Sequence, residues 1–305
     1  MKKIVITGAT GSIGNRLVQQ LTARGDEVIV FTQNPKRADE KLAKGVCLVK
    51  WDYIKPDEWK KHLNEIDTVV HLAGANLSGR RWNEEYKKIA YDSRVISTRN
   101  LVEAIKSADQ KPKAFICANA VGIYGNRYDE ILDESSLLGN DFLANLCNDW
   151  EDEVKRIENC GVRWSSIRTG LVLSQGEGLL KQLYLPFKLF LGGPLAGGHQ
   201  WFPWIHIDDI VGIYLHIIDN ESIQGPVNAA SPDIVRMKEF AEAFGKSLNR
   251  PSIFPIPKLA MKIVAGELAD YAVMSQRTSV DKIFISGYKF KFENLEDALR
   301  NLLIK

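Results

Sequence analysis

The chain has 305 residues, of which 45% are hydrophobic and 26% charged, a composition typical of a folded globular protein and unlike that of disordered or fibrous chains. Forty lysines and arginines against 38 aspartates and glutamates leave a formal charge of only +2. Such a balance gives no strong field that would favour nucleic acid, an anionic membrane or a highly acidic partner.

Cysteine usage and the N-terminal residues indicate the compartment. The four cysteines show no C-x-x-C spacing, which predicts reduced structural thiols and no metal site. The apolar stretch before Gly8 is too short for the core of a signal peptide, and the sequence contains no run of about 18 apolar residues. We therefore expect a cytoplasmic protein that makes no use of a membrane.

Short β-branched runs alternate with amphipathic segments in the first half of the chain. The predicted strands are Ile4–Thr7, Val28–Thr32, Val46–Lys50, Thr68–Leu72, Phe115–Ala118 and Trp164–Arg168. The predicted helices between them are Ile13–Arg24, Glu84–Ser107 and Phe142–Asn159. Strand and helix in this alternation predict an α/β fold built on a doubly wound parallel sheet.

The alternation stops after about residue 175, where glycines and prolines become frequent. The elements expected beyond it are a helix Asp208–Asp219, a strand Pro226–Ala229, a helix near Lys238–Leu248 and a Pro-rich strand Pro251–Pro257. We therefore predict a sheet domain over residues 1–175, completed by about 204–229. Residues 176–203 and 230–305 would form a smaller lobe.

Three glycines stand directly after the first predicted strand and before the first predicted helix. Gly8 permits a tight turn, Gly11 lets the backbone approach a pyrophosphate, and Gly14 allows close packing of the helix. The positive end of the helix dipole would face the phosphates. This loop predicts dinucleotide binding, in a cradle that also includes Thr10, Ser12 and Ile13.

The end of the second predicted strand bears on the choice of cofactor. An NAD-selective site usually carries an acid there for the ribose 2′-hydroxyl, whereas this chain has Thr32 and Gln33. Lys36 and Arg37 follow, so the residues favour NADP over NAD, with solvated surface cations as the alternative. Asp52, after the third strand, would accept from the adenine amino group or close a turn.

Three later segments are expected to border the cofactor. The backbone Leu72-Ala73-Gly74 closes the fourth strand and would run along it. Arg94 would point back to it from the next helix, with a surface ion pair as the alternative. Val172, beyond the sixth strand, would border the nicotinamide.

Longer motifs in order along the chain resemble the atypical extended short-chain dehydrogenases/reductases, within the epimerase-like family that ends in a small C-terminal domain of unknown function. The motifs include Leu72-Ala73-Gly74-Ala75-Asn76, Asp92-Ser93-Arg94, Ala120-Val121-Gly122-Ile123-Tyr124-Gly125 and Trp204-Ile205-His206-Ile207-Asp208-Asp209. The resemblance covers essentially the whole chain. It implies that residues 1–175 are an NAD(P)-binding Rossmann domain, that the smaller lobe binds substrate, and that the cofactor is NADP(H).

The chain departs from that superfamily at the catalytic positions. The superfamily pairs a Tyr general base with a Lys four residues on and a substrate-orienting Ser. Asn119 stands at the Ser position, and Cys147 and Glu151 stand in place of Tyr and Lys. Asn119 can donate a hydrogen bond but cannot relay a proton. Tyr124 is the other catalytic candidate, either as a phenol in the substrate cleft or packed beneath the loop.

Two functions from different classes follow. The first is an NADP(H)-binding oxidoreductase or nucleotide-sugar-epimerase-like enzyme that acts on an unknown small molecule without the usual Tyr-x-x-x-Lys pair. The second is a non-catalytic NADP(H)-sensing regulator linked to cell division, a label that some members of the family carry. By analogy with the superfamily we expect a homodimer, and we expect no nucleic-acid partner.

Overall fold

The computed structural model describes residues 1–303 and is centred on one parallel sheet of seven strands. Across the sheet the strand order is β11-β7-β5-β4-β1-β2-β3, and every neighbouring pair is parallel. The strands are β1 (Lys3–Thr7), β2 (Glu27–Thr32), β3 (Cys47–Lys50), β4 (Thr68–His71), β5 (Ala114–Ala120), β7 (Arg163–Thr169) and β11 (Gly225–Ala229). The predicted doubly wound α/β fold is confirmed.

The central strands form because their side chains are apolar on both faces. Ile4 and Ile6 of β1 lie in one cluster of buried side chains, and Val5 between them lies in the other. This alternation is the two-residue period of a strand that is covered on both sides. Continuous Val and Ile runs are therefore the sequence signature of this sheet.

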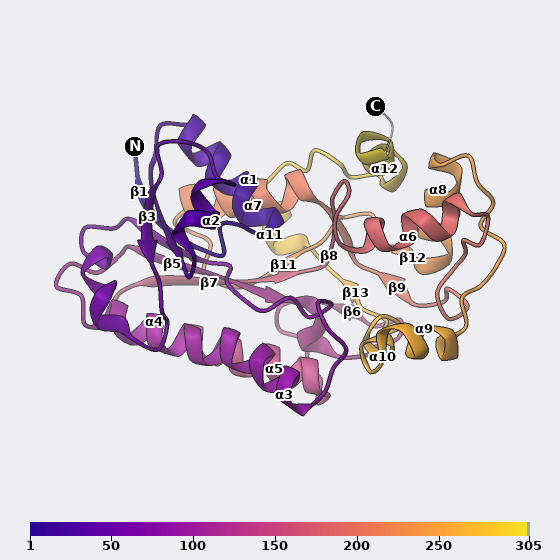
Figure 1. Ribbon diagram of the computed structural model, residues 1–305, viewed down its shortest axis with the longest axis horizontal. Helices are drawn as coiled ribbons and strands as arrows, with labels where there is room; N and C mark the ends of the chain where they lie inside the picture. The colour runs from indigo at the N-terminus through magenta and orange to yellow at the C-terminus, as the bar shows by residue number, and fades with distance from the viewer. Residues whose placement is uncertain (304–305) are drawn as a thin grey trace.

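Helices cover both faces of the sheet (Figure 1). α1 (Ser12–Ala23) and α7 (Ile207–Asp219) pack together on one face. α3 (Glu84–Tyr91), α4 (Ser97–Lys106) and α5 (Phe142–Lys155) lie on the other. Short helical turns complete this part of the chain: α2 (Pro35–Asp39) and the 3-10 turns Pro56–Glu58, Lys60–Leu63, Val121–Tyr124 and Glu158–Cys160. Among residues 1–303, no helix is both long and apolar enough to cross a membrane.

The helical run predicted over Glu84–Ser107 is present but contains a π turn. Residues Asp92–Ile96 have the π pattern of hydrogen bonds and join α3 to α4. A π turn adds a residue to the helix locally, and such turns occur frequently at functional sites. Here the turn carries Ser93 to the loop that follows β4, where its Oγ accepts from the Ala75 N–H at 2.9 Å.

The short elements outside the central sheet and its covering helices come from several parts of the chain, and they are here called the C-terminal lobe. Its strands are β6 (Ile131–Leu132), β8 (Leu171–Leu173), β9 (Trp201–Phe202), β10 (Trp204–His206), β12 (Val235–Arg236) and β13 (Arg277–Thr278). Its helices are α6 (Gly178–Lys188), α8 (Met237–Ser247), α9 (Lys258–Ala265), α10 (Leu268–Tyr271), α11 (Asp281–Ile285) and α12 (Leu295–Leu303). β6 pairs with β13, so the chain around residue 131 lies in space with the lobe. One cluster of buried apolar side chains extends from β1 to α12, so the sheet and the lobe share a core.

Two details of the lobe differ from the sequence prediction. Pro251–Pro257 is not a strand, because the prolines at 251, 255 and 257 remove backbone donors; it makes only one isolated bridge, Leu195↔Ile256. α6 was not predicted at all. It begins at Gly178 and ends at Lys188, two residues after Pro186, whose missing N–H interrupts the helical hydrogen bonds.

Asp209 ties the last part of the lobe to α7. Its buried carboxylate accepts from the backbone N–H groups of Lys291 at 2.7 Å and Phe292 at 3.0 Å. The Tyr288 hydroxyl donates to the same carboxylate at 3.1 Å. Burial raises the pKa of Asp209, and the three donors oppose that shift. The second Asp of the Asp208-Asp209 pair is therefore a structural anchor.

Replacing Asp209 by Ala should lower the free energy of unfolding by about 2–4 kcal/mol, because two backbone donors would lose their partner inside the protein. Urea unfolding measures the loss. Asp208→Ala is the matched control, since Asp208 makes only a partly exposed ion pair with Arg16, and it should cost less than about 1 kcal/mol. Equal losses for the two variants would contradict the anchor.

Candidate functional site

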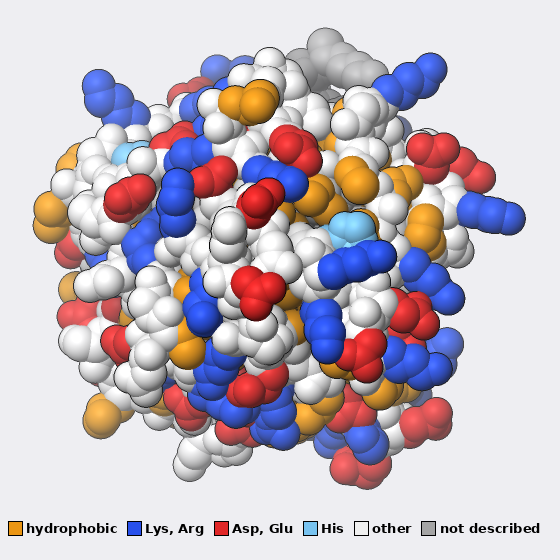
Figure 2. Space-filling view, turned by 90° about the vertical axis from the view of Figure 1, so that its left-hand side faces the viewer, with side chains coloured by type: hydrophobic (Ala, Val, Ile, Leu, Met, Phe, Trp, Pro, Cys, Tyr) orange, Lys and Arg blue, Asp and Glu red, His pale blue; other side chains and the backbone are white. Residues whose placement is uncertain are grey.

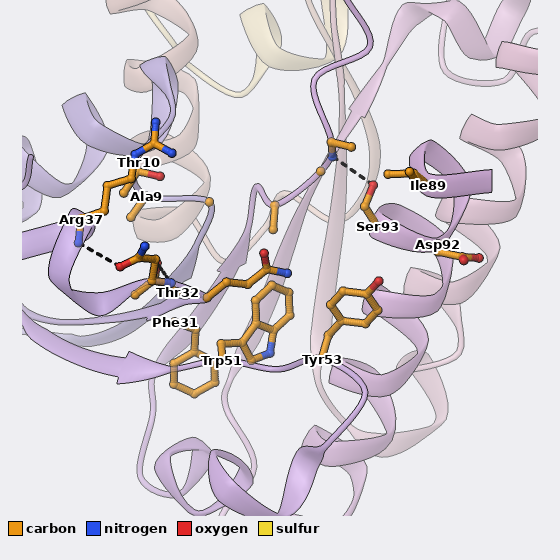
Figure 3. Close-up of a pocket in the computed structure, with 16 residues that line it drawn as sticks. Ala9, Thr10, Phe31, Thr32, Arg37, Trp51, Tyr53, Ile89, Asp92 and Ser93 are labelled. Atoms are coloured by element: carbon orange, nitrogen blue, oxygen red, sulfur yellow. Dashed lines mark hydrogen bonds between the residues drawn. The ribbon is translucent and has the colours of Figure 1, made fainter. Parts of the chain in front are cut away.

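Two adjoining cavities lie at the carboxyl ends of the sheet strands and meet at Gly8. The larger has a volume of about 460 Å³ and extends from Gly8 towards the ends of β2 and β4 (Figure 3). The smaller has a volume of about 280 Å³ and extends along the start of α1 towards β8. Open α/β sheets bind ligands at this edge. Twelve of the fourteen residues that the sequence assigns to the cofactor line these cavities: Gly8, Thr10, Thr32, Gln33, Ala73 and Gly74 the larger, and Gly8, Gly11, Ser12, Ile13, Gly14, Leu72 and Val172 the smaller.

Two glycines allow the backbones of β1, α1 and the end of β4 to touch. Gly8 has a φ of +70°, and a Cβ atom there would lie 2.6 Å from the carbonyl carbon of Leu72. A Cβ atom on Gly14 would lie 2.4 Å from the Gly8 oxygen. Both distances are too short for any side chain, so the floor of the site requires glycine at these two positions.

The first turn of α1 is an open set of donors. The N-cap residue Gly11 has no side chain to accept from the first helical N–H groups, and the first turn carries no acid. A helix of twelve residues directs its positive end and its unpaired N–H groups at the smaller cavity. The chemistry of this donor set suits the pyrophosphate of a dinucleotide.

Arg37 stands at the outer end of the larger cavity. Asn34 caps the short helix α2 by accepting from the Arg37 N–H at 3.1 Å (Figure 3). Arg37 lines the cavity together with Thr32 and Gln33, whereas Lys36 is exposed and does not. Of the two predicted cations, only Arg37 therefore reaches the site.

Asp52 closes a turn, the second of the two roles considered for it. Its Oδ1 accepts from the Ile54 N–H at 3.0 Å, and it does not line the cavity. Its neighbours Trp51 and Tyr53 do, with their rings 5.9 Å apart (Figure 3). The sequence prediction missed these rings, although they flank Asp52 directly and side chains on an extended segment alternate in direction.

A hydrogen-bonded chain holds the backbone of Leu72 and Ala73 against the cavity. The Thr7 Oγ1 accepts from both of their N–H groups at 3.2 Å, and it lies 2.7 Å from His71 Nδ1. Since this oxygen already accepts twice, its own proton points to Nδ1, which leaves the His71 proton on Nε2 towards Ser97. Burial lowers the pKa of His71 to about 3, so the ring is neutral and the chain of bonds is intact near pH 7.

Arg94 lies outside the two cavities and binds the backbone next to them. Its guanidinium donates to the Ala75 carbonyl at 3.0 Å and the Ala90 carbonyl at 3.2 Å. It lies against Gly74 and over the ring of Trp150, and it does not line either cavity. The lining on this side instead comes from Ile89 of α3 and from Asp92 and Ser93 of the π turn (Figure 3), which the sequence prediction missed.

Asn119, at the position of the superfamily's Ser, is buried and fully hydrogen-bonded. Only 4% of it is exposed. Its amide donates to the Cys147 carbonyl at 3.1 Å and to Ser166 Oγ at 3.2 Å, and its oxygen accepts from the Ala120 N–H. The contact with Cys147 shows that the three positions aligned from sequence do lie together in space.

Tyr124 is also buried, so it packs beneath the loop as the second reading of the sequence had it. Its hydroxyl donates to Asn228 Oδ1 at 2.7 Å and accepts from Arg168 at 2.8 Å. Burial raises the pKa of Tyr124 to about 12. Neither Asn119 nor Tyr124 lines the two cavities.

Glu151, at the position of the superfamily's Lys, is held in a buried ion pair. Arg168 of β7 donates twice to Glu151 of α5, at 2.7 and 3.0 Å, and the side chains are 3% and 1% exposed. Burial also raises the pKa of the neighbouring Cys147 thiol to about 12. Arg168 and Glu151 therefore engage one another, and neither of them nor Cys147 lines the two cavities. Ser174 and Glu177 are the polar side chains that β8 and the start of α6 bring to the smaller cavity, and the sequence prediction missed both.

Arg168→Met should lower the free energy of unfolding by about 3–5 kcal/mol, because it leaves Glu151 buried without its partner. The double variant Arg168→Met with Glu151→Leu should recover a large part of that loss. Chemical unfolding of the two variants tests the pair. Arg156→Met is the control, since Arg156 is 42% exposed and its buried partner Glu153 keeps a second cation, Arg99, so this variant should cost less than about 1 kcal/mol. A double variant no more stable than the single one would show that the pair is not the source of the loss.

The buried ring of His71 should make stability depend on pH. Its folded pKa of about 3 lies below the ordinary 6.5, so between these values the unfolded chain binds one more proton. Stability should therefore fall as the pH is lowered below 6.5, by about 1.4 kcal/mol per unit from this group. His71→Asn should show a shallower slope between pH 5 and 6.5 in urea unfolding. Parallel slopes would mean that His71 is protonated when folded.

Comparison with known proteins identifies the chain. Residues 4–149 match the NAD dependent epimerase/dehydratase family, and residues 256–302 match a domain of unknown function, DUF1731. The epimerase family protein SDR39U1 homolog, chloroplastic, of Arabidopsis thaliana is 36% identical over 306 residues, which is 98% of this chain and 86% of that protein.

Two solved structures are also similar. The human epimerase family protein SDR39U1 (isoform 2), crystallised with NADPH, has a TM-score of 0.89 and 34% identity, with 99% of each chain covered. MoeE5 in complex with UDP-glucose and NAD has a TM-score of 0.78 and 19% identity, covering 99% of this chain and 97% of that one, which is a likeness of fold.

The two family matches follow one another along this chain as the motifs predicted. Identity above 30% extends over nearly its full length. The chain therefore belongs to the NAD dependent epimerase/dehydratase family, among the atypical extended short-chain dehydrogenases/reductases that end in this small C-terminal domain.

Proposed function

We propose that the protein binds NADP(H) in preference to NAD(H) and is an oxidoreductase or epimerase-like enzyme acting on a small carbonyl or hydroxyl compound. The observation that carries the preference is the end of β2, where Thr32, Gln33 and Arg37 line the larger cavity. No carboxylate lies at that strand end to repel the 2′-phosphate of NADP. The human relative crystallised with NADPH supports the same choice.

Different parts of the cofactor would lie in the two cavities. Arg37 would bind the 2′-phosphate at the outer end, with Trp51 and Tyr53 beside the adenosine. The N–H groups of Ser12 and Ile13 would bind the pyrophosphate. Val172, Ala118 and Leu72 would form an apolar wall for the nicotinamide. When bound, the cofactor supplies hydride transfer.

Proton transfer has to differ from that of the superfamily. Asn119, Cys147 and Glu151 are engaged with one another and with Arg168. The substrate oxygen would therefore exchange its proton with water or with Glu177, whose exposed carboxylate lines the smaller cavity. We infer a slow enzyme whose rate depends on positioning the substrate beside the cofactor.

Arg37→Ala should weaken NADPH binding about tenfold, or ~1.4 kcal/mol, and leave NADH binding nearly unchanged. Lys36→Ala is the matched control, because Lys36 is a cation next in the chain that does not line the cavity. Fluorescence titration with both cofactors measures the effect. Tighter binding of NADH than of NADPH by the unaltered protein would refute the preference.

A non-catalytic NADP(H) sensor is the second candidate, favoured by the closed Glu151–Arg168 pair. Two measurements separate these functions. An oxidoreductase lowers the absorbance of NADPH in the presence of some aldehyde or ketone, whereas an epimerase-like enzyme restores its cofactor at each turnover and is detected by conversion of a sugar nucleotide into its epimer. A sensor binds NADPH and leaves both NADPH and every compound unchanged, while a change in proteolysis or thermal stability reports the bound state.

A further inference from the structure

Large apolar side chains are exposed along two segments of the C-terminal lobe. Each of these nine side chains is more than half exposed. They are Leu185, Leu189, Phe190 and Leu191 in and after α6, and Ile253, Phe254, Leu259, Ile263 and Val264 before and within α9, together called the apolar rim. At the opposite end of the molecule, which faces the viewer in Figure 2, hydrophobic side chains are scattered singly among charges. Single exposed apolar residues are ordinary, whereas a gathering of them marks a binding surface.

The two segments of the apolar rim lie side by side. The Phe254 N–H donates to the Gly192 carbonyl at 3.3 Å, and the Ile256 N–H donates to the Pro194 carbonyl at 2.9 Å. Backbone contact at Gly193 is so close that a Cβ atom there would lie 2.1 Å from the Phe254 oxygen. The chain that leads into α9 therefore runs along the chain that leaves α6.

The apolar rim is continuous with the cofactor cavity through α6. Gly178, the first residue of that helix, lines the smaller cavity. Steps of four and three residues place Gln182, Leu185 and Leu189 on the same face as Gly178, while Leu180, Leu183 and Phe187 are buried on the other. At 1.5 Å per residue this face extends about 16 Å from the cavity, and its outer half is apolar.

α9 follows the segment that contacts Gly192 and Pro194, and its other end lies beside α3 and the loop before it. None of its eight residues is buried, and so short a helix has little stability in water without partners. At this end the Lys262 carbonyl accepts from Arg81 at 3.4 Å, and Glu267 pairs with Lys87 at 2.7 Å. The apolar side chains of α9 are exposed between these two sets of contacts.

The smaller cavity, which the polar end of a substrate would enter, is lined by no lysine or arginine among residues 1–303, and its one charged side chain is the carboxylate of Glu177. Cations do lie near the apolar rim outside this cavity. Lys181 and Lys188 of α6 are exposed, and Arg250 lies over the ring of Phe190. A diphosphate needs guanidinium or ammonium groups in direct contact, so the smaller cavity suits a neutral group better than the diphosphate of a sugar nucleotide.

We propose that the substrate is a carbonyl or hydroxyl compound with a long apolar chain, whose polar end enters the smaller cavity and whose chain lies along α6 and against α9. This inference rests on the proposed function, which it narrows to one substrate class. It also gives the exposed side chains of α9 an apolar partner.

The test measures binding of saturated ketones of increasing length to the protein loaded with NADPH, by calorimetry, from 2-butanone to 2-decanone. Affinity should rise about fourfold per methylene, the gain from burying one such group. UDP-glucose should bind far more weakly than 2-decanone. No dependence on chain length, or tight binding of UDP-glucose, would overturn the proposal.

Leu185→Asp and Ile263→Asp should each weaken 2-decanone binding tenfold or more and leave 2-butanone and NADPH binding unchanged. Ile54→Asp is the matched control, since Ile54 is 66% exposed in the turn after β3, outside the apolar rim. Melting curves verify that each variant folds. If the rim variants instead alter oligomeric mass or sedimentation with lipid vesicles, and ketone binding is unaffected, the rim contacts a second copy or a lipid surface and the proposal is wrong.

Failure of the inference and failure of the proposed function remain distinguishable. NADPH titration alone tests the cofactor site, and it does not involve the apolar rim. If NADPH does not bind, the proposed function is wrong, and the ketone series is then measured on the protein without cofactor. If NADPH binds and chain length has no effect, only the substrate class fails.

Discussion

Everything in the candidate site depends on the contact of three backbones at Gly8, Gly14 and Leu72. A side chain on either glycine would overlap the neighbouring chain, so β1, α1 and the end of β4 meet only because neither residue has one. The contact places the uncapped first turn of α1 at the strand ends. It also brings Thr7 within reach of the Leu72 and Ala73 N–H groups. The two cavities are therefore consequences of one steric constraint.

The sheet and the cofactor loop could be predicted from sequence because their causes are local. Runs such as Ile4–Thr7 have to be buried on both faces, and the glycine spacing is read directly from the chain. The π turn at Asp92–Ile96 has no such local signal, so the lining by Ser93 was missed. α6 was missed for the opposite reason, since Gly178 and Pro186 disfavour a helix that burial of Leu180, Leu183 and Phe187 nevertheless stabilises.

The catalytic candidates show more clearly what could not be predicted from the sequence. Alignment by motif placed Asn119, Cys147 and Glu151 together, and the hydrogen bonds of Asn119 agree. The sequence did not reveal that Arg168, from a different strand, closes on Glu151. Nor did it reveal that the Tyr124 hydroxyl is held between Arg168 and Asn228. Whether a polar residue is free or engaged is decided by contacts distant in sequence.

The same ion pair links the chemistry to the choice of substrate. A Tyr–Lys pair is polar and partly open, and it draws the reacting hydroxyl or carbonyl to the cofactor by hydrogen bonding. Here Asn119 of β5 and Arg168 of β7 are buried and engaged with Glu151, and in the proposed site the wall beside the substrate would be Leu72, Ala118 and Val172. A site that offers few directional bonds must hold its ligand by burial of apolar area. The exposed side chains along α6 and α9 would extend that wall outwards, so the apolar rim would supply the binding that a buried polar pair cannot.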